Sequence, residues 1–265
     1  MKTVATIEAR MASARLPGKV LAPINGRPLL AVIIQRVRAA REVDQVVVAT
    51  TGSSGDDAIQ KLAEQAGVGY FRGSEQDVMG RVLGAARAFG ADNLVALTGD
   101  NPLVDPRLID DVIAFQRVGG YEYVTTTHMH HSANWKVERT FPVGVSVQVM
   151  TVRALADAAG RATDHREREY ASFAIYDHPE RYRLGAFEAT AKYEAWRRPE
   201  LRLTVDTPED LDLMRQIFDR LSPRNPLFST GDAIRLVAED DRLQAINRHI
   251  SQRKVFEAML RATQA

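Results

Sequence analysis

The stretch that decides the fold of this chain spans residues 3–21 and reads TVATIEARMASARLPGKVL. Its first part, residues 3–7, is a short apolar run that predicts a buried strand. The loop behind this strand spaces the cations Arg10, Arg15 and Lys19 among small residues. Small residues let backbone N–H groups approach a ligand closely, and fixed cations neutralise an anion. Strand and loop together indicate a phosphate-binding site at the carboxyl edge of an α/β sheet.

Two common phosphate-binding motifs are absent from this loop. It lacks the GxxxxGK[ST] spacing of a Walker A loop and the GxGxxG spacing of a dinucleotide site. Taken alone, the loop is therefore also consistent with a basic surface turn. The rest of the chain decides between the two interpretations.

Length and composition indicate an ordinary globular protein. The chain has 265 residues, of which 45% are hydrophobic and 26% charged, and its net charge is +1. This balance gives no bulk electrostatic attraction to nucleic acid or to a membrane surface. The sequence has no cysteine, which excludes disulfides, thiolate metal sites and a cysteine nucleophile. No apolar run approaches the roughly 18–20 residues of a membrane span, so we expect a cytoplasmic protein.

Apolar runs alternate with amphipathic segments in the first half of the chain. The runs 46–50 and 93–98 are typical of strands buried on both faces. Helices are predicted over 29–37, from residue 58 to Gly67, and over 78–89, with a short strand at 68–71. Strands and helices in this order predict an α/β fold, in which helices flank a mostly parallel mixed sheet.

The pattern changes after residue 120. Residues 121–127 and 143–149 alternate in period two, as strands with one solvated or partner-facing side do. We expect residues 120–150 to form a small β arm that contacts the acceptor substrate and a second copy of the chain. A homodimer is therefore predicted.

The polar insert between these two segments carries His128, His130 and His131. Closely spaced histidines without a helical i, i+4 pair or a carboxylate motif are more often loop residues than zinc ligands. The sequence leaves open whether they bind anything.

Beyond residue 150 the expected elements are two helices, through Leu155 and over 170–176, and two strands, over 182–187 and 201–206. Thr207 then caps a helix that has proline at its first position and Asp210 at the capping-box position. Two prolines follow this helix. We therefore divide the chain into a main domain over 1–221 and a helical extension over 222–265.

Two carboxylates stand directly behind predicted strands. Asp100 follows the strand at 93–98, and Asp206 ends the strand at 201–206. Ligands bind outside the carboxyl ends of the strands of an open α/β sheet, at the edge that also holds the basic loop. Each aspartate alone is also explained as a helix cap or turn former. Facing a cationic loop, the pair instead indicates an Mg²⁺ site that shares substrate phosphates.

Four further charged residues lie near predicted strand-to-helix junctions or on a predicted helix face. Arg72 and Asp77 flank a glycine at such a junction, and a helix cap explains Asp77 equally well. The mixed-charge run 164–169 reads as a solvated helix face, from which Arg166 or Arg168 could reach an anionic acceptor.

Four stretches in order resemble the motifs of the spore coat polysaccharide cytidylyltransferase family, a relative of the CMP-Kdo and CMP-sialic acid synthetases. They read IEARMASARLPGKVL at 7–21, FRGSEQDV at 71–78, LTGDNPL at 97–103 and LTVDTPED at 203–210. The resemblance spans residues 1–220 and leaves the last helices outside. It implies a Rossmann-like nucleotidyltransferase fold of the GT-A type.

The same resemblance implies attack of an acceptor oxygen on the α-phosphorus of a nucleoside triphosphate, usually CTP. Arg10, Lys19, Asp100 and Asp206 would be catalytic, with Mg²⁺ on the two aspartates. The residues expected at the substrates are Ala9, Arg10, Met11, Ser13, Arg15, Lys19, Arg72, Asp77, Gly99 and Arg166. The product is an activated sugar acid or a related small acidic molecule for surface glycan synthesis, with release of pyrophosphate.

Two segments depart from the family pattern. Ser146 and Gln148 stand where many relatives carry acidic residues, and residues 166–170 read REREY rather than REHVT. Both lie where the acceptor pocket and the dimer contact are expected. Two alternative functions follow: a glycosyltransferase that uses a ready-made sugar nucleotide, and a catalytically silent nucleotide-binding protein.

Overall fold

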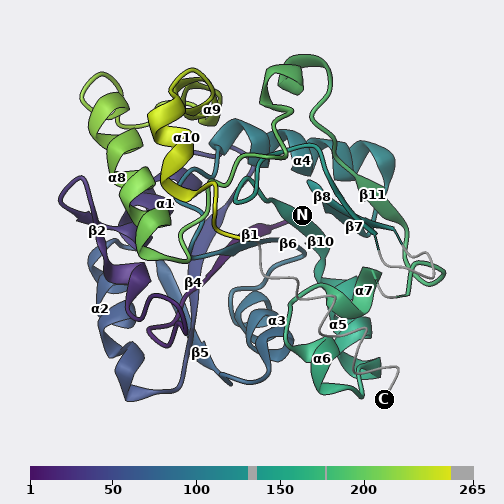
Figure 1. Cartoon of the computed structure of the whole chain (residues 1–265). Helices are drawn as coiled ribbons and strands as arrows, with labels where there is room; N and C mark the ends of the chain where they lie inside the picture. Colours follow the sequence, from purple (N-terminus) through teal and green to yellow (C-terminus); the bar gives the residue numbers. More distant parts are fainter. Residues whose placement is uncertain (131–135, 177, 252–265) are drawn as a thin grey trace, which may run out of the picture.

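The computed structural model describes residues 1–130, 136–176 and 178–251 and is built around one seven-stranded sheet (Figure 1). The strand order is β11-β7-β10-β6-β1-β4-β5. The strands are β1 (Thr3–Glu8), β4 (Gln45–Thr51), β5 (Gly69–Gly73), β6 (Asn93–Thr98), β7 (Tyr123–Thr125), β10 (Gln148–Thr151) and β11 (Leu184–Ala186). Only β10 runs antiparallel to its neighbours. The predicted mostly parallel mixed sheet is confirmed.

Helices cover both faces of this sheet. The helices of the first half are α1 (Leu29–Val37), α2 (Asp57–Gln65), α3 (Val78–Ala88) and α4 (Pro106–Gly119). Those of the second half are α5 (Val152–Arg161), α6 (His165–Arg168), α7 (Phe173–Tyr176), α8 (Pro208–Leu221), α9 (Thr230–Ala238) and α10 (Asp241–Asn247). Side chains of α1, α2 and α4 share one buried cluster, whereas α3, α5 and α7 share another. The sheet therefore separates two apolar layers.

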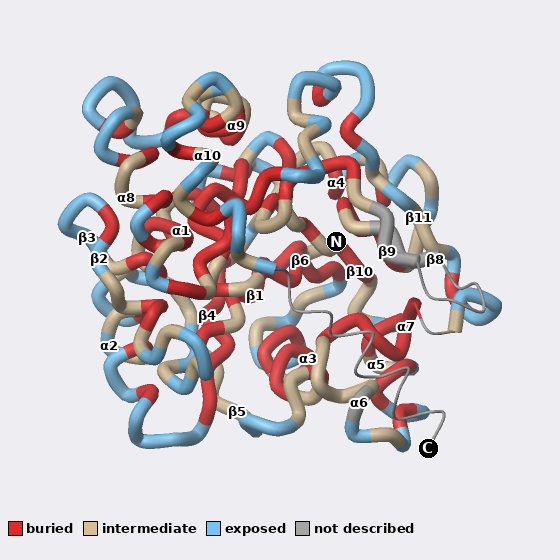
Figure 2. The backbone as a smooth tube through the Cα atoms, in the orientation of Figure 1, coloured by how far each residue is buried: buried red, intermediate tan, exposed pale blue. Residues whose placement is uncertain are grey.

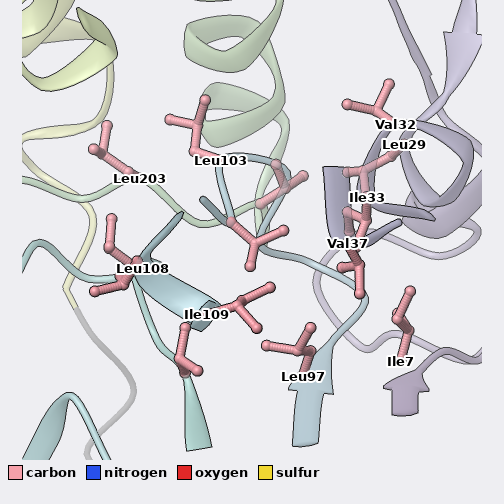
Figure 3. Packing of buried hydrophobic residues seen from close by; sticks show 14 of the residues in the cluster. Ile7, Leu29, Val32, Ile33, Val37, Leu97, Leu103, Leu108, Ile109 and Leu203 are labelled. Carbon is pink, nitrogen blue, oxygen red and sulfur yellow. The ribbon is translucent and has the colours of Figure 1, made fainter. Parts of the chain in front are cut away.

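The central strands supply the core because they are buried on both faces. Figure 2 shows many buried residues in β1, β4 and β6 and many exposed residues in the outer loops. Figure 3 shows side chains from β1, β6, α1 and α4 that belong to one buried cluster with Leu103 and Leu203. Leu103 and Leu203 follow Asp100 and precede Asp206, respectively. Apolar packing thus brings the two aspartate segments together.

The direction of winding reverses at β1. The chain passes from β1 to β4 and β5 on one side, and then returns to β6 on the other side of β1. In open α/β sheets the carboxyl ends of the two strands at such a reversal flank the usual ligand crevice. The basic loop follows β1 and Asp100 follows β6, so both lie at the carboxyl ends of the two strands that flank this reversal.

The predicted strand at 201–206 is wrong. Only Arg202 pairs, through an isolated bridge to Val143, and the segment crosses the sheet edge instead of joining the sheet. Its backbone N–H groups form hydrogen bonds to two loops: Leu203 N donates to Val143 O at 2.7 Å, and Val205 N donates to Asp100 O at 2.8 Å. Asp206 still reaches the carboxyl edge by this route.

Three other predictions differ in extent. Within residues 143–149, only Gln148 onward is strand, since Val147 N is taken by the Thr126 hydroxyl at 3.0 Å. The expected polar insert is partly a hairpin of β8 (Thr127–His130) and β9 (Lys136–Arg139). His131 lies outside the described residues. The helix expected over 170–176 is shorter, since α7 begins at Phe173.

The C-terminal helices share the core of the sheet. Phe228 and residues of α9 and α10 belong to the same buried cluster as α1 and β1. The buried Arg36 of α1 donates to Phe228 O at 3.0 Å, and Thr230 N donates to Asp105 at 2.9 Å. No helix in the described part of the chain is long and apolar enough to cross a membrane.

Gly144 permits the crossing of the 201–206 segment. Its φ is +95°, and a Cβ atom there would lie 2.4 Å from Leu203 O. Gly144→Ala should lower the free energy of unfolding by about 2–4 kcal/mol through backbone strain and overlap. Urea unfolding measures this change.

The matched control is Gly160→Ala in α5. Nothing lies within 4 Å of a Cβ at Gly160, so alanine should stabilise its helix by about 0.5–1 kcal/mol. Equal effects of the two substitutions would contradict the role given to Gly144.

Candidate active site

The loop from Ala9 to Gly18 is closed on itself and anchored to β4. Met11 O accepts hydrogen bonds from Ser13 N at 3.0 Å and from Gly18 N at 2.9 Å. Ala9 N donates to β4, and Met11 N donates to the buried Asp56 carboxylate at 2.8 Å. The loop therefore has a fixed base, from which Arg10 and Arg15 extend with exposed side chains.

Lys19 begins the short 3₁₀ helix η1 (Lys19–Leu21) directly behind this loop. Its Nζ donates to Asp100 Oδ2 at 2.9 Å, to Asp206 Oδ1 at 2.8 Å and to Val205 O at 2.8 Å. We call Lys19, Asp100 and Asp206 the Lys19 cluster. The structure thus brings together three of the four residues expected to be catalytic.

The cluster is poorly exposed, and its charges depend on one another. The side chains of Lys19, Asp100 and Asp206 are 11%, 24% and 16% exposed. Burial alone would lower the pKa of Lys19, but the two carboxylates outweigh this effect and raise that pKa above 10.5. Burial alone would raise the pKa of Asp206, but Lys19, Arg15 and Arg202 hold it below 3.8.

Asp206 receives cations on both of its oxygens. Oδ1 accepts from Lys19, while Oδ2 forms an ion pair with Arg15 at 3.0 Å and accepts from Arg202 at 2.8 Å. Arg15 is therefore placed at the cluster, as the sequence predicts. Arg202 is a residue of the site that sequence reasoning missed.

Asp100 is oriented by its neighbours in the turn after β6. The Thr98 hydroxyl donates to Asp100 Oδ1 at 2.6 Å, and Gly99 N donates to Glu8 O at 2.8 Å. A Cβ on Gly99 would lie 2.7 Å from Glu8 O. Gly99 therefore permits the close approach of this turn to β1, which brings Asp100 to Lys19.

The donor set of the cluster fits a hard divalent cation. Two carboxylate oxygens and the Val205 carbonyl converge on the Lys19 ammonium, which stands in for a cation at their centre. Oxygen donors of this kind are the ligands that Mg²⁺ takes in proteins, together with phosphate oxygens and water. Among residues 1–130, 136–176 and 178–251, no group of three or more His, Asp or Glu is placed to hold a metal ion, and the Lys19 cluster contributes two carboxylates.

Several predicted residues lie elsewhere. Arg10 pairs with Glu75 at 3.3 Å. Arg72 donates to Thr51 O at 2.9 Å and pairs with Asp57, so it braces the loop after β4. None of these contacts reaches the Lys19 cluster.

Asp77 is the N-cap of α3, as one of its two interpretations predicts. It accepts from Gly80 N at 2.7 Å, and it also pairs with Arg168 of α6 at 2.9 Å. Arg166 lies in α6, but the structure does not describe its side chain, nor those of His128 and His130.

Glu8, at the end of β1, is another residue without a predicted role. It is half-buried, and burial raises its pKa to about 7 despite the opposing charge of Arg81. The buried Arg81 donates to Ser74 O, while its Nε has no hydrogen-bond partner in the described structure. A carboxylate at the end of an otherwise apolar strand was the only sequence signal.

Gln148, one of the departures from the family pattern, is held within the protein. Its amide oxygen accepts from the Tyr123 hydroxyl at 3.1 Å and from the Ser172 hydroxyl. Burial raises the pKa of Tyr123 to about 12. These groups fix β10 to β7 and to the start of α7.

A surface hollow of about 520 Å³ lies away from the Lys19 cluster, between α1 and α2.

Removing the Lys19 ammonium leaves two carboxylates facing each other. Lys19→Met should therefore lower the free energy of unfolding by about 2–4 kcal/mol at pH 7 without added metal. The folded-state pKa of Asp206 lies below its ordinary value of 3.8. Its stabilisation is therefore present above pH 3.8 and is lost as the pH falls through the folded-state pKa.

The loss in Lys19→Met should accordingly shrink in acid. Urea unfolding at pH 7 and pH 3 measures it, with the exposed Lys61→Met as control. A loss of the same size at both pH values would contradict the ionic account.

Known proteins resemble this chain over most of its length. A family model for cytidylyltransferases matches residues 4–234. The spore coat polysaccharide biosynthesis protein SpsF of Bacillus subtilis is 32% identical over 238 residues, covering 87% of this chain and 92% of that protein. The 3-deoxy-manno-octulosonate cytidylyltransferase 2 of Hydrogenovibrio crunogenus is 32% identical over 200 residues, or 73% of this chain and 76% of that one.

A solved structure shows the same architecture. The cytidylyltransferase from Leptospira borgpetersenii superimposes with a TM-score of 0.81 at 28% identity, covering 92% of this chain and 96% of that one. The family match spans the basic loop, both aspartates of the Lys19 cluster and the whole sheet. The chain therefore belongs to the cytidylyltransferase family and is a nucleotidyltransferase.

Proposed function

We propose that this protein transfers CMP from CTP to a sugar acid or a related small acidic acceptor, with release of pyrophosphate, for surface glycan synthesis. The observation that carries the proposal is the Lys19 cluster. At the carboxyl edge, beside the reversal of the sheet, two carboxylates and three cations meet within hydrogen-bond distance. A metal-bound triphosphate needs carboxylates for the cation and positive charge for its phosphates.

Mg²⁺ is proposed as the cofactor, held by Asp100 and Asp206 in place of the Lys19 ammonium. When bound, it would polarise the phosphate oxygens and neutralise charge that develops as pyrophosphate leaves. The exclusively oxygen donor set supports Mg²⁺ over softer metals.

The chain's own residues bind and orient the triphosphate. Lys19, displaced from the two carboxylates, would donate to the phosphates from the base of the loop. Arg15 lies beside it, and Arg10 would add charge from the far end of the loop, once released from Glu75. Nucleotidyl transfer depends on charge neutralisation and in-line positioning, which these fixed cations supply. The acceptor hydroxyl loses its proton to solvent water as its oxygen forms a bond to the α-phosphorus, and the bond from that phosphorus to the leaving pyrophosphate breaks.

The substrates and pathways of two relatives support the proposed acceptor. One acts on 3-deoxy-manno-octulosonate, a sugar acid, and the other takes part in spore coat polysaccharide biosynthesis. Arg168 and Gln148 lie in the two segments where the sequence places the acceptor pocket. We further propose a cytoplasmic homodimer in which the β8–β9 hairpin contacts the second copy, for which light scattering is the test.

Two other functions are separable from this one, the glycosyltransferase by ligand binding and the silent nucleotide-binding protein by its lack of pyrophosphate release. A glycosyltransferase of this fold takes a diphosphate sugar, and a silent relative binds nucleotide without turnover. The loop of Arg10, Arg15 and Lys19 favours a triphosphate. Thermal-shift measurements with Mg²⁺ should therefore show stabilisation by CTP above that by the other nucleoside triphosphates and by UDP- or GDP-sugars. Preferential stabilisation by a sugar nucleotide would favour the glycosyltransferase.

Substitution of either aspartate tests the catalytic assignment. Asp100→Asn and Asp206→Asn should each reduce pyrophosphate release from CTP by about 10³-fold or more, because each removes a charge that the metal–phosphate complex requires. A panel of sugar acids and phosphorylated acceptors supplies the second substrate. Asp212→Asn, on the exposed face of α8, is the control and should keep full turnover. Pyrophosphate release at the wild-type rate in both the Asp100→Asn and Asp206→Asn proteins would contradict the metal assignment.

A further inference from the structure

The last residue of α10 lies behind the Lys19 cluster rather than on the surface. Asn247 is 4% exposed although it stands near the end of the described chain. Its Nδ2 donates to Asp210 Oδ1 at 2.8 Å and to Arg202 O at 3.0 Å. Both partners accept hydrogen bonds only, so the amide NH₂ group must face them and its orientation is fixed.

Asp210 connects this asparagine to the rest of the network. It is fully buried and forms a two-point pair with Arg202, with Nε–Oδ1 and Nη2–Oδ2 distances of 2.9 Å. It also accepts from the backbone N–H groups of Asp206 at 3.0 Å and Thr207 at 3.1 Å. The Asp210 carboxylate therefore holds both the backbone of Asp206 and the arginine that contacts the Asp206 side chain.

Arg202 completes the connection to the cluster. Its side chain is 7% exposed, and its Nη2 donates both to Asp210 Oδ2 and to Asp206 Oδ2. The carbonyl of Arg202 is held by Asn247, so backbone and side chain of this arginine are fixed together. The orientation of the Asp206 carboxylate thus depends on contacts that lead to α10.

We propose that Asn247 is a positioning residue for the Asp206 carboxylate, which makes the C-terminal helices part of the catalytic unit. The inference rests on the proposed function, because it assigns Asp206 to the cation of that reaction. Loss of the Asn247 amide leaves a buried carboxylate oxygen and a buried carbonyl with one partner fewer. Arg202 then gains freedom to shift, and the carboxylate loses its fixed angle toward the cation.

The experiment compares Asn247→Leu, which keeps approximate size without a donor, with Asn247→Asp, which keeps shape but places a second carboxylate against Asp210. Gln244→Leu, one turn earlier on α10, is the matched control, since Gln244 contacts Ala238 O rather than the network. Each full-length protein is titrated with Mn²⁺ by electron paramagnetic resonance in the presence of α,β-methylene CTP. Circular dichroism gives the folded fraction.

Both Asn247 variants should bind Mn²⁺ about 10-fold more weakly, because loss of an outer partner of a metal ligand commonly has an effect of that size. We expect kcat for pyrophosphate release to fall by a similar factor, with the KM for CTP changed less than about 2-fold. Gln244→Leu should match the wild-type chain in all three quantities.

Wild-type Mn²⁺ affinity in the folded fraction of both Asn247 variants would overturn the inference and leave the proposed function standing. An equal loss in Gln244→Leu would overturn it as well, since it would point to a general effect of the helix. Absence of CTP-dependent pyrophosphate release by the wild-type chain would instead overturn the proposed function and the inference with it.

Discussion

The ammonium group of Lys19, held between Asp100 and Asp206, is the interaction on which the site depends. It brings together the ends of β1 and β6 and a segment more than 180 residues away in sequence. Two carboxylates this close repel each other strongly at low exposure, so they require a cation between them. In the free protein the lysine supplies that charge. In the proposed complex the metal would supply it, and the lysine becomes available to the phosphates.

The fold serves this arrangement through backbone approach as much as through side chains. The reversal of winding at β1 places the basic loop and Asp100 at neighbouring strand ends. Gly99 lets the turn after β6 approach β1, and Gly144 lets the 201–206 segment cross the edge. The packing of Leu103 and Leu203 in one apolar cluster holds both aspartate segments in place.

The sequence predicts the fold and the centre of the site because their signals are local. Buried parallel strands are continuous apolar runs, and Asp100 and the basic loop follow such runs directly. Asp206 lies beside Lys19 at the carboxyl edge, although the segment before it is not the strand that the sequence predicts. The capping box correctly predicts that Thr207 and Asp210 start α8.

The remaining part of the site could not be predicted because it arises from distant contacts. Nothing near Asn247 in sequence marks it as a partner of Asp210, 37 residues earlier. The position of Arg72 at a strand end predicts a substrate contact, but in the structure its guanidinium donates to the backbone carbonyls of Thr51 and Ser53. The raised pKa of Glu8 is caused by its burial in the folded chain, which the sequence around it does not indicate. Charged residues at strand ends are thus predictable in position, but not in partner.

The most direct test of the central claim is a crystal structure with Mn²⁺ and α,β-methylene CTP. The account predicts anomalous density between the carboxylates of Asp100 and Asp206, within about 2.3 Å of an oxygen of each. It also predicts that Lys19 Nζ has left both carboxylates and contacts a phosphate oxygen. A metal bound away from both aspartates, with the Lys19 contacts unchanged, would contradict it.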